Sequence, residues 1–376
     1  MHQDMITIMS GMTPAEFISA LNSNFTELAT AWGVNQTSEA KSFDTFTVNN
    51  ATPANISKNI RSLRVVYGQN ASSYITEING GFAGTEKRFQ DDFSGNIIPS
   101  MTVYGEPTAL VSDDGNQIDL WFTGTVLGVS NIYYSYSTDG KTYATPVKTD
   151  IPNGYMRGGI MKVGNTYYHY ANGNLDTTIH CFSSTDKTHY TDLGEVIGLG
   201  GAGVWDSKNL GNTFAWKEGE SYFLFYDGLK LGEYWKTGMA TAFAPEGPWT
   251  KYENNPLFSG TNRDVEGAEM FRVSNEIIKH NGRYYIYINS GVSGDQGPFY
   301  DIKRFYSSDL HTWVDEGNIL NVLHLEAGYI SYADVAFVQF KGKSYMFNNP
   351  SNQVNAGYLD VAIDNRPLSE LLALYP

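Results

Sequence analysis

From about residue 100 onward, the chain alternates between short aromatic runs and polar turns. Five runs rich in Tyr, Phe and Ile each follow a turn that contains Gly or Asn, near residues 115, 164, 219, 282 and 342. Turns of this kind connect neighbouring strands in tight antiparallel hairpins. The pattern therefore predicts five hairpins. Their aromatic runs are Ile118–Thr123, Thr166–Tyr170, Ser221–Tyr226, Arg283–Ile288 and Ser344–Phe347.

The hairpins recur at a nearly regular interval, because their turns lie 49, 55, 63 and 60 residues apart. Repeats of this length, each holding several strands, are what the blades of a β-propeller require. A second element recurs in the same region: a Ser-x-Asp sequence followed by an aromatic residue, beginning at Ser137, Ser184 and Ser307. We expect each copy to end a strand in an Asp turn and assign it a structural role only.

The first 95 residues follow a helical pattern instead. Thr13–Glu16 carries the signals of a helix start, with a capping Thr, a Pro at the first helical position and a Glu that completes a capping box. Related residues recur 57 positions later. Because a short helix is unstable alone, we expect these helices to pack on a neighbour and to favour a homo-oligomer. The apolar stripe of the first helix is Ile18, Leu21, Phe25 and Leu28.

The sequence therefore predicts a mainly β protein, in which a five-bladed β-propeller over residues 96–376 follows a small helical attachment region over residues 1–95. Composition agrees with this division, because aromatic residues make up 14% of the chain and Gly numbers 38. Aromatic residues fit the pleated surface of a sheet, and Gly supplies turns. Tyr and Trp also suit sugar binding, although most of these rings are expected to lie in the core.

Charge and cysteine content exclude several classes of function. The formal net charge of −15 excludes a nucleic-acid or anionic-membrane partner held by a basic face. Residues 1–12 lack a secretory signal, and no run of eighteen apolar residues predicts membrane insertion. Cys181 alone forms no internal disulfide. The seven histidines show no ligand spacing, so no zinc, other metal or cofactor is expected, and nothing specifies an axial calcium.

The N-terminal segment SGMTPAEFISALNSNFTEL resembles the short N-terminal segments of bacteriophage tail and tail-fibre proteins. The resemblance covers about twenty residues and is repeated once. It implies that the region attaches to a virion, with other phage tail proteins as partners, and that the protein is made in the host cytoplasm. The alternative is an ordinary helical cap on an enzyme.

Residues 100–365 resemble the five-bladed β-propeller glycoside hydrolases of families 43, 32 and 117. The segments GNTYYHYANG, GESYFLFYDG, GRYYIYINSG and APEGPWTK, together with the Ser-x-Asp turns, carry the resemblance. In that superfamily, three carboxylates from different blades face the substrate in a central funnel. Hydrolysis of a glycosidic bond needs one carboxylic acid and one ionised carboxylate.

The resemblance implies three catalytic candidates. Asp264–Met270 is similar to the segment that carries the general acid in family 43, which makes Glu266 the acid candidate. Asp206 then resembles the carboxylate that orients the acid, and Glu106 with the following Pro107 resembles the Asp-Pro that supplies the base or nucleophile. Glu in place of Asp lengthens this last side chain.

Five further residues are candidates for substrate binding. Arg157 stands on the blade between Glu106 and Asp206, where the family places an Asp. There it is expected to hold a substrate carboxylate, as on a uronic or sialic acid, or to mark a funnel that has lost its chemistry. Glu269 and Asp334 occupy similar positions before their hairpins, and Trp205 and Trp235 are candidate sugar platforms.

These features favour a phage tail protein whose propeller recognises and hydrolyses a host-surface glycan. Three alternatives remain open at this point: a non-catalytic receptor-binding module, a structural tail component and an intracellular bacterial glycosidase.

Overall fold

The computed structural model describes residues 96–173, 175–259, 269–292, 299–320, 331–351 and 359–373. All of these ranges belong to one compact unit, made of residues 89–322 and 329–376. The helices predicted within residues 1–95 and the acid candidate Glu266 lie outside the described residues. The predicted division at residue 95 therefore stays a prediction.

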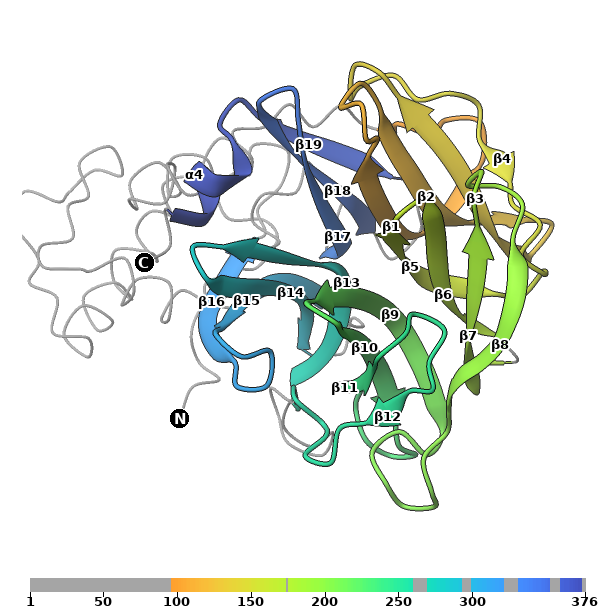
Figure 1. Cartoon of the computed structure of the whole chain (residues 1–376), viewed down its shortest axis with the longest axis vertical. Helices are drawn as coiled ribbons and strands as arrows, with labels where there is room; N and C mark the ends of the chain where they lie inside the picture. Colours follow the sequence, from red (N-terminus) through yellow and green to blue (C-terminus); the bar gives the residue numbers. More distant parts are fainter. Residues whose placement is uncertain are drawn as a thin grey trace, which may run out of the picture. The chain divides into compact units, whose positions relative to one another are not determined.

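The described residues form five antiparallel sheets, in each of which the strands follow one another in sequence order (Figure 1). The sheets are β1 (Thr102–Val111), β2 (Ile118–Val126), β3 (Val129–Ser137) and β4 (Val147–Lys148); β5 (Met156–Val163), β6 (Thr166–Gly173), β7 (Thr178–Ser184) and β8 (Thr191–Gly198); β9 (Asn209–Glu218), β10 (Ser221–Leu229), β11 (Lys236–Ala242) and β12 (Thr250–Lys251); β13 (Glu269–His280), β14 (Arg283–Val292), β15 (Phe299–Ser307) and β16 (Val314–Leu320); and β17 (Ser331–Phe340), β18 (Lys343–Ser351) and β19 (Asp360–Asp364).

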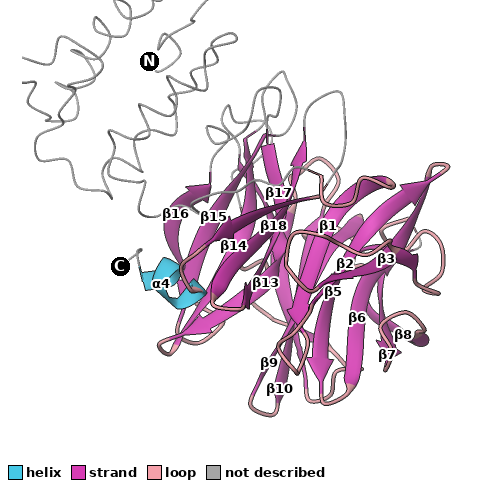
Figure 2. Ribbon diagram, turned by 90° about the horizontal axis from the view of Figure 1, so that it is seen from above, coloured by secondary structure: helices cyan, strands magenta, loops and turns pink. Residues whose placement is uncertain are grey.

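The first strands of the sheets close into a ring. They contact one another in the order β1, β5, β9, β13 and β17, and β17 contacts β1 again. A closed ring of five sheets is a five-bladed β-propeller, so the predicted fold class is confirmed. Figure 2 shows that strands dominate, and α4 (Leu368–Ala373) is the one α-helix within the described ranges.

The predicted hairpins are present at the predicted turns. The last two are two-residue turns, in which both central residues have positive φ: 49° and 75° at Asn281 and Gly282, and 48° and 79° at Lys341 and Gly342. This backbone twist matches that of the flanking strands, and Asn and Gly adopt it at low cost. Local turn chemistry therefore sets the start of each aromatic run.

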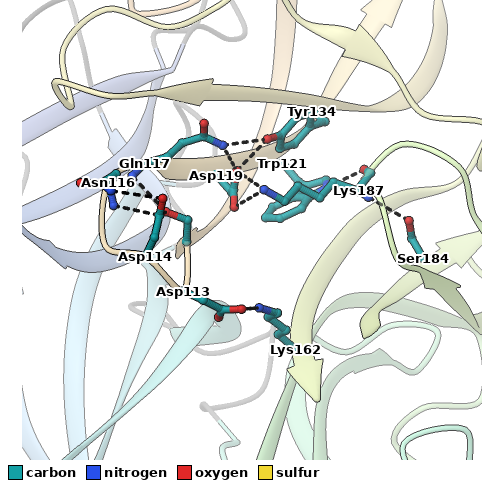
Figure 3. A network of polar contacts seen from close by, with 11 residues as sticks. Asp113, Asp114, Asn116, Gln117, Asp119, Trp121, Tyr134, Lys162, Ser184 and Lys187 are labelled. Carbon is teal, nitrogen blue, oxygen red and sulfur yellow. Dashed lines mark hydrogen bonds and ion pairs between the residues drawn. The ribbon is translucent and has the colours of Figure 1, made fainter. Parts of the chain in front are cut away.

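A buried polar network joins the first two blades (Figure 3). Asp119 of β2 is 1% exposed and accepts hydrogen bonds of 2.6 Å from the Tyr134 hydroxyl and from Gln117 Nε2. Its Oδ2 lies 2.8 Å from Lys187 Nζ, which comes from the turn after β7. The carbonyl of Lys187 accepts a hydrogen bond from Trp121 Nε1 at 3.2 Å. The Asp119 carboxylate and its donors thus link the first two sheets. Without these donors, the buried carboxylate would be unpaired, which is energetically costly.

The Ser-x-Asp motifs form turns of the expected kind. In the last copy, the Asp309 carboxylate accepts hydrogen bonds from the backbone N–H groups of Thr312 at 2.7 Å and His311 at 2.9 Å. These bonds favour the ionised carboxylate and lower the pKa of Asp309 from 3.8 to about 2. Asp139 and Asp186 make the equivalent contacts in the other two copies. The motif is therefore a stabilising turn.

We predict that Asp309→Asn destabilises the propeller in a pH-dependent way. Because the pKa of Asp309 is lowered on folding, its contribution is complete above pH 3.8 and is lost as the pH falls through about 2. The turn is exposed, so the expected loss at pH 7 is about 0.5–1 kcal/mol, measured by urea unfolding. At pH 2 the difference between variant and wild type should shrink. An equal difference at both values would contradict this account.

Candidate functional site

The first strands of three blades carry a charged residue in a strained conformation near their start. Glu106 on β1 and Arg157 on β5 have φ of 58°, and Asp334 on β17 has φ of 54°. In each case the pairing with the second strand shifts register at this point, as in a β-bulge. A non-glycine residue in this region costs about 1–2 kcal/mol. Such strain is concentrated at functional sites, where it aims a side chain.

Glu106 is held by donors from two blades. Its side chain is buried, and Oε2 accepts hydrogen bonds from Thr123 Oγ1 at 2.7 Å and from the backbone N–H of Arg157 at 2.9 Å. Its Oε1 lies 3.2 Å from Arg157 Nε. These contacts all come from donors, so the ionised carboxylate is the form that they favour.

Arg157 also faces a second carboxylate. Its Nη1 lies 2.9 Å from Asp176 Oδ2, on the loop between β6 and β7. Asp176 in turn accepts a hydrogen bond of 2.6 Å from Asn172 Nδ2. The Asp176 backbone carbonyl accepts another of 2.6 Å from the N–H of Leu210, the second residue of β9. The guanidinium is thus bound between two carboxylates of the protein itself.

Asp334 gathers amides from two further blades. Its Oδ1 accepts hydrogen bonds of 2.9 Å from Asn212 Nδ2 on β9 and from Asn289 Nδ2 on β14. The backbone N–H of Asp334 donates to Asn289 Oδ1, also at 2.9 Å. The described contacts form two groups, Glu106 with Arg157 and Asp334 with Asn212 and Asn289. We call these five residues the axial ring, because each comes from a different blade and all but Asn289 lie on first strands, which contact one another.

Two close approaches complete the surroundings of the ring. A side chain at Gly105 would lie 2.1 Å from Asn349 Nδ2, so β18 reaches the start of β1. A side chain at Gly211 would lie 2.9 Å from the Cβ of Asp227 and 3.0 Å from the ring of Trp235. Asp227 is fully buried and accepts a hydrogen bond from Thr237 Oγ1 at 2.7 Å. The sugar-platform candidate Trp235 therefore packs against the start of β9, next to the axial ring.

Asp206 and Trp205 make their described contacts within the third blade. Asp206 precedes β9, and its Oδ2 lies 2.6 Å from Lys251 Nζ on β12, the outermost strand of that blade. The Tyr226 hydroxyl donates to the same oxygen at 3.1 Å. Burial and the nearby Asp206 raise the pKa of Tyr226 well above its usual range, which keeps this donor protonated. The catalytic role expected of Asp206 stays a prediction, but its described contacts are those of a structural ion pair.

Trp205 packs on the same part of the third blade. Side chains at Gly228 and Gly238 would lie 2.4 and 2.5 Å from its indole ring, so only glycine fits there. The ring also lies 5.3 Å from that of Tyr226, centroid to centroid. This packing anchors the loop that leads into β9. Of the two tryptophans expected to bind sugar, Trp235 is the one beside the axial ring.

The remaining candidates come from the fourth blade. Glu269 is the first residue of β13 and pairs with Val292, but its side chain, like the whole of Glu266, lies outside the described residues. Within the described ranges, no three His, Cys, Asp or Glu side chains are grouped as a metal ion requires. No helix in those ranges is long and apolar enough to cross a membrane.

Four polar residues of the site were not predicted. Two of them share a sequence signal, because Asp227 and Asn289 directly follow the aromatic run of a second strand, in Tyr-Asp-Gly and Ile-Asn-Ser. The other two carry no such signal. The four are Asp176, Asn212, Asp227 and Asn289.

Several solved structures have a fold similar to that of this protein. A protein solved as an RGII complex has a TM-score of 0.58 and 13% identity, over 79% of this protein and 96% of that one. The α-L-arabinanase of Cellvibrio cellulosa, complexed with arabinohexaose, has a TM-score of 0.53 and 12% identity, over 73% and 98%. A family 117 glycoside hydrolase of the marine bacterium Zobellia galactanivorans has 0.50 and 14%, over 75% and 92%.

These likenesses show that the protein shares the five-bladed fold of glycoside hydrolases. At such low identities the fold alone does not fix the function. No protein family and no curated protein matches the sequence.

We predict that Glu106→Gln destabilises the propeller by about 2–3 kcal/mol, because it leaves a buried guanidinium with only part of its countercharge. The matched control is Asp113→Asn, which removes the partner of Lys162 from a pair whose aspartate is 77% exposed and should cost at most about 1 kcal/mol. Chemical unfolding at pH 7 measures both. Equal losses for the two variants would show that the buried pair has no special role.

Proposed function

We propose that the propeller binds and hydrolyses a glycan at the axial ring. The observation that carries this proposal is the ring itself: two carboxylates, two amides and a guanidinium from five different blades converge near the starts of the first strands. Carboxylates and amides are the groups that exchange hydrogen bonds with sugar hydroxyls. The similar fold of an arabinanase that holds arabinohexaose supports the same ligand class.

The chemistry assigned to the site is hydrolysis with two carboxyl groups. The general acid gives its proton to the leaving glycosidic oxygen, while water or a carboxylate attacks the anomeric carbon; in sum one water is consumed. Glu106 suits the role of ionised carboxylate, because Arg157 and Thr123 favour its charged form. The acid role rests on the resemblance of the segment around Glu266 to that of family 43. Trp235 would stack on an apolar face of the sugar.

One observation favours a second candidate function, a glycan-binding module without catalysis. Both oxygens of Glu106 are already engaged by Thr123 and Arg157, at 2.7 to 3.2 Å. A carboxylate in an ion pair is a weaker base and nucleophile than one that is less stabilised. In that case the axial ring would recognise a receptor glycan and leave it intact.

We also propose that residues 1–95 attach the propeller to a phage tail and that the glycan lies on the host surface. The support is the repeated sequence pattern of that region alone. The competing proposal is an intracellular bacterial glycosidase with a helical extension.

Glu266→Gln should lower the rate of reducing-end release from the cleaved glycan by about 100- to 10 000-fold, because the amide cannot donate the proton. Glycan binding should stay within about twofold of wild type, since the two side chains have the same shape. Glu253→Gln, at an exposed glutamate, is the matched control and should change neither quantity. Undiminished release would refute the acid assignment. Binding by wild type without any release would favour the binding module.

The location is tested by asking whether the full chain stays with purified phage particles. We expect mass spectrometry to find the full chain in such particles and to miss a chain that lacks residues 1–95. Recovery of both forms only from the bacterial lysate, with none in the particles, would support the intracellular glycosidase.

A further inference from the structure

The partners of Arg157 carry an inference about the class of sugar that the site accepts. An arginine in a carbohydrate site is well suited to hold a sugar carboxylate with two parallel hydrogen bonds. Here the guanidinium is 12% exposed, with Nε 3.2 Å from Glu106 and Nη1 2.9 Å from Asp176. Two of the three guanidinium nitrogens thus lie within ion-pair distance of carboxylates of the protein.

Asp176 is fixed in this place by its backbone conformation and by two hydrogen bonds. Its backbone has φ of 64°, which commits the loop to one sharp turn. Its Oδ1 accepts a hydrogen bond from Asn172 Nδ2 and its carbonyl accepts one from Leu210 N, both at 2.6 Å. The Asp176 side chain is 29% exposed, so it stands at the border between the ring and solvent.

The charge around the axial ring disfavours an anionic ligand. The ring contains one cation, Arg157, and two carboxylates, Glu106 and Asp334, while Asp176 adds a third carboxylate in contact with it. Among these described side chains negative charge is in excess, so a negatively charged sugar beside them would face net repulsion at short range.

The loops that follow the second strands of the first three blades present leucines, where an anion-binding site would place Lys or Arg. One of these leucines adjoins Asp176. Lys230, which adjoins another, shares the Glu233 carboxylate with Lys236, and each ammonium lies 2.7 Å from it. This cluster on the third blade therefore keeps one net positive charge, whereas Leu127 and Leu175 have no Lys or Arg next to them in the sequence. The leucines are Leu127, 99% exposed, Leu175, 91% exposed, and Leu231, 73% exposed.

We propose that Asp176 is a specificity-determining residue, which occupies on Arg157 the place that a substrate carboxylate would take and so restricts the site to uncharged glycans. This inference rests on the proposed function, since it concerns the same site. It opposes the expectation from sequence that Arg157 holds a uronic or sialic acid.

The test compares wild type with Asp176→Asn on an array of matched oligosaccharides, in which each neutral sugar has a partner that carries a uronic acid. Wild type should bind the neutral members. Asp176→Asn releases one side of Arg157 and should bind the uronic members about tenfold more tightly than wild type does, with neutral binding changed by less than about threefold. Raising NaCl to about 0.5 M should erase the gain.

Two controls separate this local effect from others. Asp113→Asn removes the same charge from an exposed pair with Lys162, so it should give no gain on the uronic members. The double variant Asp176→Asn/Arg157→Gln should lose the gain, because the guanidinium that would bind the new carboxylate is absent. A gain shared by Asp113→Asn, or one that persists without Arg157, would overturn the proposal.

The outcomes also distinguish this inference from the proposed function. If wild type binds no glycan but Asp176→Asn gains binding to uronic members, the proposed function is wrong and the role of Asp176 is supported. If wild type binds neutral glycans and the variant shows no gain, the proposed function is supported and the role of Asp176 is wrong. If Asp176→Asn does not fold, the wild type alone decides: a preference for uronic over neutral members contradicts the inference, and a preference for neutral members that weakens with salt supports it.

Discussion

The pairing of Arg157 with Glu106 and Asp176 is the interaction on which the axial site depends. Five sheets that close around an axis bring polar side chains into a crowded space, where an unpaired charge would be costly. Arg157 pairs with Glu106 on the first blade and with Asp176 on a loop of the second, so none of these charges is left unpaired. The same loop binds the start of β9 through Leu210. The same contacts that stabilise the closure also fix the positions and charges of the candidate site.

Backbone strain and side-chain pairing act together at this end of the propeller. The bulges turn Glu106, Arg157 and Asp334 toward neighbouring blades, and their positive φ values persist because the surrounding contacts overcome the local cost. Small residues make room for these contacts. A side chain at Gly158 would lie 2.0 Å from Nε2 of His169, whose burial lowers its pKa to about 3 and keeps it neutral. Several contacts from neighbouring blades therefore fix the positions of the axial-ring side chains.

The sequence predicted what depends on local chemistry. Hairpin turns such as Asn281-Gly282 are determined by a few neighbouring residues. Glu106, Arg157 and Asp334 could be predicted because each precedes one of those hairpins on the first strand of its blade. On the third blade, Asn212 contacts Asp334 and lies six positions after the predicted Asp206, whose role stays a prediction. An amide at this place is not expected from a pattern of carboxylates, and Asp206 lies before the first residue of β9. Asp176 was missed because its contact with Arg157 is long-range and no local pattern marks it.

The most direct test of this account is a crystal structure of the propeller with a neutral oligosaccharide that it binds. The account predicts a sugar ring at the starts of the first strands, within hydrogen-bond distance of Asn212 or Asp334, with Trp235 against one of its faces. A sugar bound on the outer strands, with the axial ring untouched, would contradict it.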